Sequence, residues 1–298
     1  MGLARVPRRL IVSADDFGLS PGVNRGIVQA HVNGVLTNAS LMVNGAAFEE
    51  AVELARAHPR LAVGLHLVLL QGRSTLEPAE IPGLVGESGE FSLRPVVTGL
   101  RYFFVRSLYG QIEREVRAQI EKFLATGLRL SHVDGHLNIH MHPTVLEILL
   151  RVAPEYGIRA LRLPNEPLCI SLRASAWQWW RKLAEAITFR ALVAHARQRL
   201  DQKGLRYADF LFGLHQSGRM TEPYLEAIMR SLPAGVTEVY THASIVDEEA
   251  RRWRPAHYRC EEELRALTSP HLRQLIASLG IELTNYARLA DAAPDRSP

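Results

Sequence analysis

Short apolar, β-branched runs alternate with longer amphipathic segments along almost the whole chain. The runs predicted to be strands are Leu10–Ala14, Thr37–Val43, Leu61–Leu67, Leu128–Val133, Ala160–Leu163, Phe210–Leu214 and Glu238–Thr241. The segments predicted to be helices are Pro21–Asn33, Phe48–Ala57, Gln111–Ala125, Pro143–Tyr156 and Glu222–Ser231. Such alternation is typical of a parallel sheet with helices packed outside it. With about seven strands, we predict a distorted, closed or nearly closed (β/α) barrel.

An open doubly wound sheet is the alternative architecture, although no G-x-G-x-x-G motif follows the first predicted strand. A chain of 298 residues could form one barrel or two smaller domains. We predict a single α/β domain over 1–291. Within it, residues 71–95, rich in Gly, Pro and Glu, form a long loop beside the site. After it, residues 292–298 form a disordered tail.

Composition limits the possible partners and the compartment. The formal charge of +4 comes without a compact Lys/Arg block, so a nucleic-acid partner is not expected. Cys169 and Cys260 are far apart and form no C-x-x-C motif, which argues against a disulfide scaffold and a thiolate zinc site. The basic N-terminal stretch lacks the long apolar run of a signal peptide. We therefore expect a cytoplasmic protein.

Titratable side chains occur at the carboxyl ends of several predicted strands. They are Asp15 and Asp16 after the first strand, His66 near the end of the third, the group His132, Asp134, His136, His140 and His142 after the fourth, Arg162 on the fifth and His242 after the last. In a barrel, these ends open onto one face, where the active sites of such enzymes are found. The sequence therefore predicts that these residues converge.

Four of the 12 histidines lie within SHVDGHLNIHMHP (131–143), which favours a metal site. One carboxylate and two imidazoles would bind one divalent metal ion and leave positions for water and substrate. The alternative is that some of these histidines cap the next helix or lie on the surface. The spacing does not decide which of His136, His140 and His142 bind metal.

The adjacent carboxylates of Asp15 and Asp16 could serve as a helix N-cap or a turn. However, Ser20 already offers a cap for the next helix. One carboxylate could instead bind metal while its neighbour hydrogen-bonds a water. A glycosidase pair is disfavoured, because its carboxyls lie about 5 Å or more apart across a sugar bond.

Four segments resemble those of the YdjC-like carbohydrate deacetylases, which remove acetyl groups from N-acetylated amino sugars on a barrel similar to that of polysaccharide deacetylases. They are LIVSADDFGLSPGVNRGI (10–27), LTNASLMVNG (36–45), AVGLHLVL (62–69) and SHVDGHLNIHMHP (131–143). The runs IRALRLP (158–164) and EVYTHAS (238–244) add weaker support. The ADDFG run together with H-x-D-x-H is a specific combination.

The resemblance implies hydrolysis by metal-activated water at one zinc or magnesium ion. It implies that Asp16, His66 and His136 bind the metal and that Asp15 is the general base. It further implies that Arg162 orients Asp15 and that His242 is the general acid or stabilises the tetrahedral intermediate. Asp134, His140 and Asn138 are expected to bind substrate or to surround the ligands.

This chain departs from the family pattern at two positions. Asn138 stands where relatives often have another His, and Ala243 replaces the usual Pro. His140 is spaced i,i+4 from His136 and could replace or supplement a ligand. The departure at Asn138 bears on the surroundings of the ligands more than on the metal site.

Residues 171–200 combine Trp177, Trp179 and Trp180 with several cations, and RYFFVR (101–106) is a second aromatic-basic run. This composition is typical of an interfacial membrane helix, and equally of a helix packed in a core or dimer interface. The LRLPNEP and FGLHQSGRMTEPY (212–224) segments resemble the hopanoid-biosynthesis-associated branch of the family. That branch implies a lipid-linked N-acetylglucosamine and peripheral contact with the inner face of the membrane.

Other functions compete with deacetylation of a lipid-linked sugar. Within the family, the alternative substrate is a chitooligosaccharide. A phosphoesterase would require two metal ions and more basic residues near the site. A non-catalytic metal-binding accessory protein would not need Asp15, and a lectin-like sugar binder would release no acetate.

Overall fold

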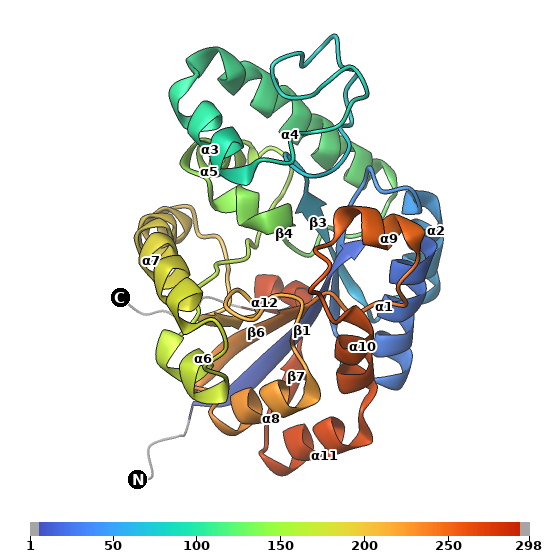
Figure 1. Cartoon of the computed structure of the whole chain (residues 1–298), viewed down its shortest axis with the longest axis vertical. Coiled ribbons are helices and arrows are strands. Elements are labelled where there is room, and N and C mark those ends of the chain that lie inside the picture. Colours follow the sequence, from blue (N-terminus) through green and yellow to red (C-terminus); the bar gives the residue numbers. More distant parts are fainter. Residues whose placement is uncertain (1–5, 293–298) are drawn as a thin grey trace.

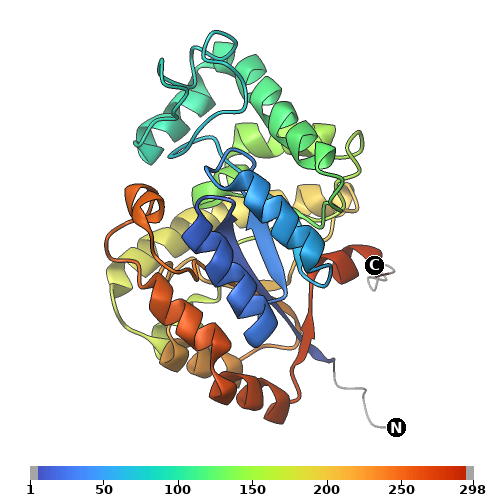
Figure 2. The ribbon, with the colours of Figure 1, turned by 90° about the vertical axis from the view of Figure 1, so that its right-hand side faces the viewer.

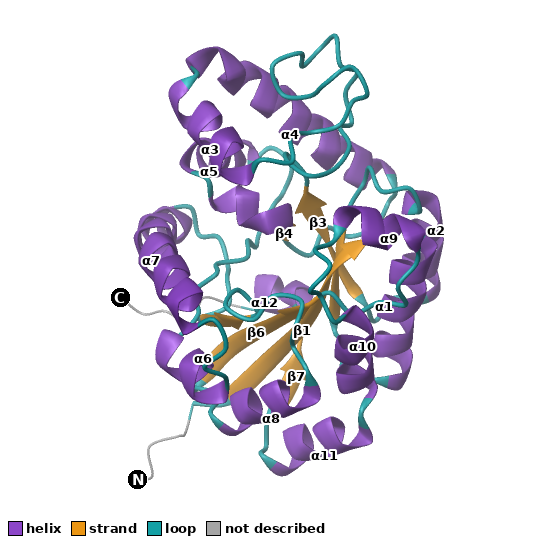
Figure 3. Cartoon of the chain, in the orientation of Figure 1, coloured by secondary structure: helices purple, strands orange, loops and turns teal. Residues whose placement is uncertain are grey.

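The computed structural model describes residues 6–292, which form a seven-stranded parallel sheet surrounded by helices (Figures 1 and 3). The strands are β1 (Arg8–Phe17), β2 (Asn38–Leu41), β3 (Ala62–Leu67), β4 (Val133–Gly135), β5 (Phe210–Phe212), β6 (Gly235–Thr241) and β7 (Glu282–Thr284). Their order is β4-β3-β2-β1-β6-β5, and β7 also pairs with β1.

The helices that follow the strands vary in length. The α-helices are α1 (Pro21–Asn33), α2 (Phe48–Ala57), α3 (Pro95–Phe104), α4 (Tyr109–Ala125), α5 (Pro143–Val152), α6 (Leu168–Ala174), α7 (Trp179–Gln202), α8 (Glu222–Arg230), α9 (Glu248–Trp253), α10 (Cys260–Thr268), α11 (Pro270–Ser278) and α12 (Tyr286–Asp291). Two 3₁₀ turns, η1 (Arg106–Leu108) and η2 (His136–Met141), complete the list. None of the described helices combines the length and apolar character that crossing a bilayer requires.

Local sequence explains the first helices. Ser20 caps α1 by accepting a hydrogen bond from the Val23 N–H, and Pro21 occupies the first turn, as helix starts favour. In α2, Phe48, Ala51, Val52 and Ala55 form one buried stripe with helical spacing. Figure 2 shows α1 and α2 side by side across the sheet, and the predicted bounds of both are confirmed.

The prediction of a distorted α/β barrel is confirmed, because an irregular segment joins the two edge strands of the curled sheet. The N–H of Val133 in β4 donates to the Ala160 carbonyl at 3.0 Å, and the N–H of Arg162 donates back to the Val133 carbonyl at 3.1 Å. On the other side, the N–H of Leu211 in β5 donates to the Asn165 carbonyl at 3.1 Å. Residues 160–165 therefore close the ring without forming a regular strand.

Two strand predictions need correction, and one strand was not predicted. Regular pairing of the fourth strand begins only at Val133, because residues 128–130 are partly exposed, not buried in the sheet. The predicted strand Ala160–Leu163 contains only isolated bridges. Strand β7 was missed, since Glu282–Thr284 has no apolar run and Glu282 is exposed.

Two segments singled out in the sequence have distinct structures. Residues 71–94 contain turns and isolated bridges and lead directly into α3. Residues 171–200 are divided between α6 and α7, with a break at 175–178. In α7, Trp179 and Trp180 are exposed, whereas Trp177 lies before the helix and stacks against Arg219 at 4.3 Å. The predicted tail lies outside the described residues except for Ala292.

Candidate metal centre

Strand β1 ends in an irregularity that brings two consecutive aspartates to one cavity. Its register with β2 shifts between Ala14 and Phe17, and Asp16 has a φ of +70°. Consecutive residues of a regular strand face opposite sides, but Asp15 and Asp16 line the same cavity. A left-handed backbone at a non-glycine residue is uncommon and clusters at functional sites.

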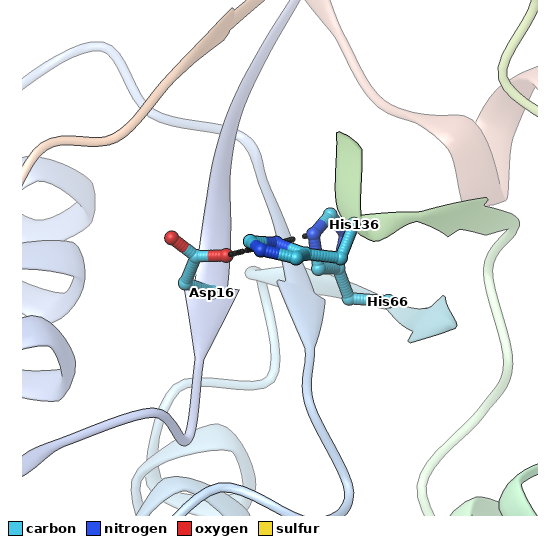
Figure 4. Close-up of side chains that lie close together, drawn as sticks. All are labelled: Asp16, His66 and His136. Atoms are coloured by element: carbon cyan, nitrogen blue, oxygen red, sulfur yellow. Dashed lines mark ion pairs between the residues drawn. The ribbon is translucent and has the colours of Figure 1, made fainter. Parts of the chain in front are cut away.

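Three side chains from separate elements meet at this cavity. The Oδ1 atom of Asp16 lies 3.5 Å from Nε2 of His66 and 3.3 Å from Nδ1 of His136 (Figure 4). His66 comes from the end of β3, and His136 from the start of η2. All three residues are buried, and their potential ligand atoms lie within 4.8 Å of one another.

This geometry could hold a divalent metal ion. Ligand atoms about 2.0–2.2 Å from a tetrahedral metal lie roughly 3.4 Å from each other. The observed separations of 3.5 and 3.3 Å match that value. Asp16 Oδ1 is also buried without a hydrogen-bond partner, a costly state that a bound cation would relieve.

The far side of His66 is held by a carboxylate. Its Nδ1 lies 2.8 Å from Oδ1 of Asp134, which directs Nε2 towards Asp16. A carboxylate behind a histidine is the usual support for a metal ligand, because it fixes the ring and its tautomer. Burial would raise the pKa of Asp134, but Arg162 and His66 hold it well below its usual range. Asp134 thus supports a candidate ligand, and it also belongs to a second group of potential ligands with Asp15 and His66.

Arg162 lies at the centre of a buried ionic network. Its Nη1 and Nη2 contact the two carboxylate oxygens of Asp15, both at 2.9 Å. It also pairs with Asp134 at 2.7 Å and with Glu238 at 2.9 Å. A fork of two parallel hydrogen bonds fixes the plane of a carboxylate, so Arg162 sets the orientation of Asp15.

Arg254 makes a comparable contact with Asp16. Both Nε and Nη2 lie 2.9 Å from Asp16 Oδ2, while Nη1 donates to the carbonyl of His242 and to Ser244 Oγ. Burial would raise the pKa of Asp16, but Arg254 and the neighbouring His136 keep it well below its usual range. Asp16 is therefore held ionised, with Oδ1 turned to the histidines.

His242 follows β6 and lines the same cavity. Burial lowers the pKa of its ring to about 4, against the opposing effect of the Asp16 and Asp15 carboxylates. Its Nδ1 is buried without a partner, and its ring lies 4.8 Å from that of Tyr258. A neutral imidazole near pH 7 can donate one N–H and accept at the other nitrogen.

The remaining residues of the histidine cluster do not join the candidate ligands. Neither group of potential ligands among residues 6–292 includes His140 or His142. His140 Nε2 lies 3.0 Å from the Arg162 carbonyl oxygen, and His142 Nε2 lies 3.0 Å from that of Gly99. Asn138 lines the cavity with a φ of +56°, and its Oδ1 is buried without a partner.

Several residues of the site were not identified from the sequence. They are Arg254, Glu238, Tyr258 and Trp253. Glu238 had a weak sequence signal, since a carboxylate in the middle of a short buried strand is unusual. No sequence signal pointed to Arg254, because the RRWR run (251–254) is typical of an exposed basic segment. The cavity that Arg254, Tyr258 and Trp253 help to line has a volume of about 310 Å³.

Comparison with known proteins yields one family. A family model described as YdjC-like protein matches residues 9–278. A carbohydrate deacetylase from Geobacillus stearothermophilus is 35% identical, with 94% of this chain and 98% of that protein covered. One from Brevibacillus brevis is 32% identical, with 94% and 99% covered. A crystal structure from Enterococcus faecalis, provisionally described as a cellobiose-phosphate cleavage protein, has a TM-score of 0.75 and 26% identity over 95% of this chain and 99% of that one.

Proposed function

The chain belongs to the YdjC-like protein family, and on this premise we propose that it is a metal-dependent carbohydrate deacetylase. The reaction is hydrolysis of the amide bond that joins an acetyl group to an amino sugar. The observation that carries the proposal is the cluster of Asp16, His66 and His136 beside an aspartate held by Arg162. The relatives named as carbohydrate deacetylases support the same reaction.

Asp16, His66 and His136 are the proposed ligands of one divalent metal. When bound, this ion polarises the acyl oxygen and makes water acidic enough to lose a proton near neutral pH. Two imidazoles and one carboxylate suit zinc or a similar transition metal better than magnesium. Asp134 has a supporting role, since it fixes the ring of His66.

Asp15 is the proposed general base. The irregular end of β1 brings its carboxylate into the cavity that Asp16 also lines. The two hydrogen bonds from Arg162 hold it in one orientation and keep its charge compensated in a buried position. A water between Asp15 and the acetyl carbon would give its proton to this carboxylate as the new C–O bond forms.

His242 is the proposed partner of the acyl group. Because its ring is neutral near pH 7, an N–H from His242 can donate to the oxygen that gains charge during attack. This supports stabilisation of the tetrahedral intermediate over initial proton donation. For the later step, the proton accepted by Asp15 can pass to the leaving sugar amine, and the C–N bond then breaks.

The sugar is proposed to be N-acetylglucosamine, either lipid-linked, as in a hopanoid, or part of a chitooligosaccharide. The exposed aromatic side chains Trp179, Trp180, Phe103 and Phe104 support a peripheral contact with the inner face of the membrane. The same side chains could instead bury an interface in a homodimer. The membrane contact is expected if the substrate is lipid-linked, and the homodimer interface is the alternative role of these aromatic side chains.

Acetate release tests the proposal. We expect metal-stripped protein to release no acetate from N-acetylglucosamine conjugates, and zinc to restore release. In Asp15→Asn, kcat should fall about 100-fold or more while zinc still binds. Zinc-loaded protein that released no acetate from oligosaccharide or lipid-linked conjugates would contradict deacetylation. An Asp15→Asn variant of normal activity would contradict the assignment of the base.

A further inference from the structure

A second cavity, of about 830 Å³, lies along one side of α7. Its lining includes Leu183, Ala186, Ile187, Arg190, Val193, Ala194, Arg197, Gln198 and Asp201. These positions recur at helical spacing, so they form a single face of the helix. At 1.5 Å per residue, this face is roughly 27 Å long. We call this cavity the α7 groove.

The floor of the groove comes from the segments that close the barrel. It includes Pro164 and Asn165 at the end of the irregular segment, Glu166 and Leu168 just after it, and Leu214 and His215 after β5. Leu183 and Ile187 are 43% and 67% exposed, so the groove is open to solvent along α7. Nine of the sixteen lining residues are apolar, and the volume lies within the usual range for sites of small molecules.

Only one layer of side chains separates the groove from the candidate metal centre. Phe189 and Leu214 line both cavities. Glu185 lines the metal-site cavity, and its Oε2 lies 3.2 Å from Nδ1 of His215, which lines the groove. The two cavities therefore adjoin, with Phe189 and Leu214 as their common wall.

The groove also contains an unsatisfied polar atom. His215 is only 1% exposed, and its Nε2 is buried without a hydrogen-bond partner. Nδ1 lies 3.2 Å from the Glu185 carboxylate, so Nε2 is the ring nitrogen left for a ligand. A hydroxyl group of a ligand would satisfy it.

We propose that the α7 groove binds the apolar portion of an amphiphilic glycoconjugate whose N-acetylated sugar occupies the metal centre. This inference rests on the proposed function and names the substrate class. The metal-site cavity, at about 310 Å³, lies near the lower end of the range for ligand sites, so a larger conjugate must extend beyond it. The adjoining groove is long and mostly apolar, as an extended hydrocarbon body requires.

The test compares two substrates that share the sugar. Methyl and dodecyl N-acetylglucosaminides would be assayed below the critical micelle concentration of the dodecyl compound. Burial of even two methylene groups corresponds to about tenfold in affinity, so we expect kcat/KM for the dodecyl glycoside to exceed that for the methyl glycoside by at least this factor. Equal values for the two would overturn the proposal.

A matched pair of variants locates the effect. Ala194 is exposed and lines the groove, so Ala194→Trp fills it without disturbing the core. Ala191 is also exposed on α7 but does not line the groove, so Ala191→Trp is the control. We expect the preference for the dodecyl glycoside to fall towards one in Ala194→Trp and to persist in Ala191→Trp. A preference retained by both variants, or lost equally by both, would overturn the proposal.

Calorimetric titration separates this inference from the proposed function. If neither glycoside is deacetylated, the proposed function fails, yet the groove still predicts that the dodecyl glycoside binds the wild type at least about tenfold tighter than Ala194→Trp. Equal binding would overturn the groove assignment. A groove that instead serves a second copy of the chain would show as a dimer that Ala194→Trp dissociates, with the substrate preference unchanged.

Discussion

Asp16 uses its two carboxylate oxygens for different partners. Oδ2 accepts a hydrogen bond from Nε of Arg254 and lies 2.9 Å from its Nη2, and Oδ1 faces the two histidines without a hydrogen bond of its own. Arg254 also donates to the His242 carbonyl, so one guanidinium positions both a candidate ligand and the backbone of a candidate catalytic residue. We therefore expect Arg254 to act as a positioning residue for the candidate metal centre.

Replacement of Arg254 should weaken metal binding. Loss of a residue that orients a metal ligand typically costs 10–100-fold in affinity, and we expect a loss of about this size for zinc in Arg254→Ala. Competition with a chromogenic chelator measures it. Arg251→Ala, which removes an exposed arginine from the same basic run, is the control and should bind zinc as the wild type does. Equal zinc affinity in both variants would rule out the positioning role.

At the scale of elements, α4 anchors the long loop that follows β3. The buried carboxylate of Glu115 accepts hydrogen bonds from the backbone N–H groups of Thr75 and Leu76, and Gln119 bonds both the N–H and the carbonyl of Val68. A loop that has no regular structure of its own thus obtains its backbone partners from a helix. Its conformation should depend on these side chains.

Glu115→Gln should loosen residues 71–94. The carboxylate now accepts hydrogen bonds from two backbone N–H groups, and the amide NH₂ of Gln would face one of them. This leaves a buried donor unpaired, which lowers the free energy of unfolding by about 1–3 kcal/mol. We expect faster cleavage within this segment during limited proteolysis of the folded protein. Glu121→Gln, an exposed change on the same helix, is the control. Identical cleavage rates in wild type, variant and control would contradict the anchoring role.

The elements also show what could be predicted from the sequence. The apolar runs of β1, β3 and β6 are local signals, and they placed Asp16, His66 and His242 correctly at strand ends. The bulge at Asp16 and the irregular closure at 160–165 depend on pairing between strands far apart in the sequence. No local sequence pattern therefore predicted them. Arg254 reaches Asp16 across 238 positions of sequence, and only the tertiary fold brings the two together. The residue roles and the single-domain assignment stay predictions.

At the scale of the whole molecule, the candidate metal centre places His66 of β3 among carboxylates from β1 and β4. Burial alone would lower the pKa of His66, but the Asp134, Asp15 and Asp16 carboxylates overcome it and raise the pKa to about 9. Without metal, His66 is therefore protonated at pH 7 and itself compensates the charge of these carboxylates. A metal ion must displace this proton, because only a neutral imidazole can bind it.

Stability and metal binding should therefore respond to pH in opposite directions. The folded pKa of His66 lies above the unfolded value of about 6.5, so its stabilising contribution is complete below about pH 6.5 and is lost as pH rises towards 9. Between pH 7.5 and 8.5 we expect the free energy of unfolding of metal-free protein to fall, by up to about 1.4 kcal/mol per pH unit. Zinc affinity should rise over the same interval, by up to about tenfold per unit.

Urea unfolding in the presence of a chelator would measure the change in unfolding free energy with pH. Calorimetric zinc titration would measure the change in zinc affinity with pH. This interval suits the test because Glu263, whose pKa burial raises to about 7, is already largely ionised there. His66→Asn should flatten the stability slope of the metal-free protein, whereas His195→Asn, at an exposed position, should retain it. Metal-free protein that became more stable between pH 7.5 and 8.5, or a slope unchanged in His66→Asn, would show that His66 does not carry this proton. Because the two slopes are opposite in sign and similar in size, the free energy of unfolding of the zinc-saturated protein should stay nearly constant between pH 7.5 and 8.5, where that of the metal-free protein falls.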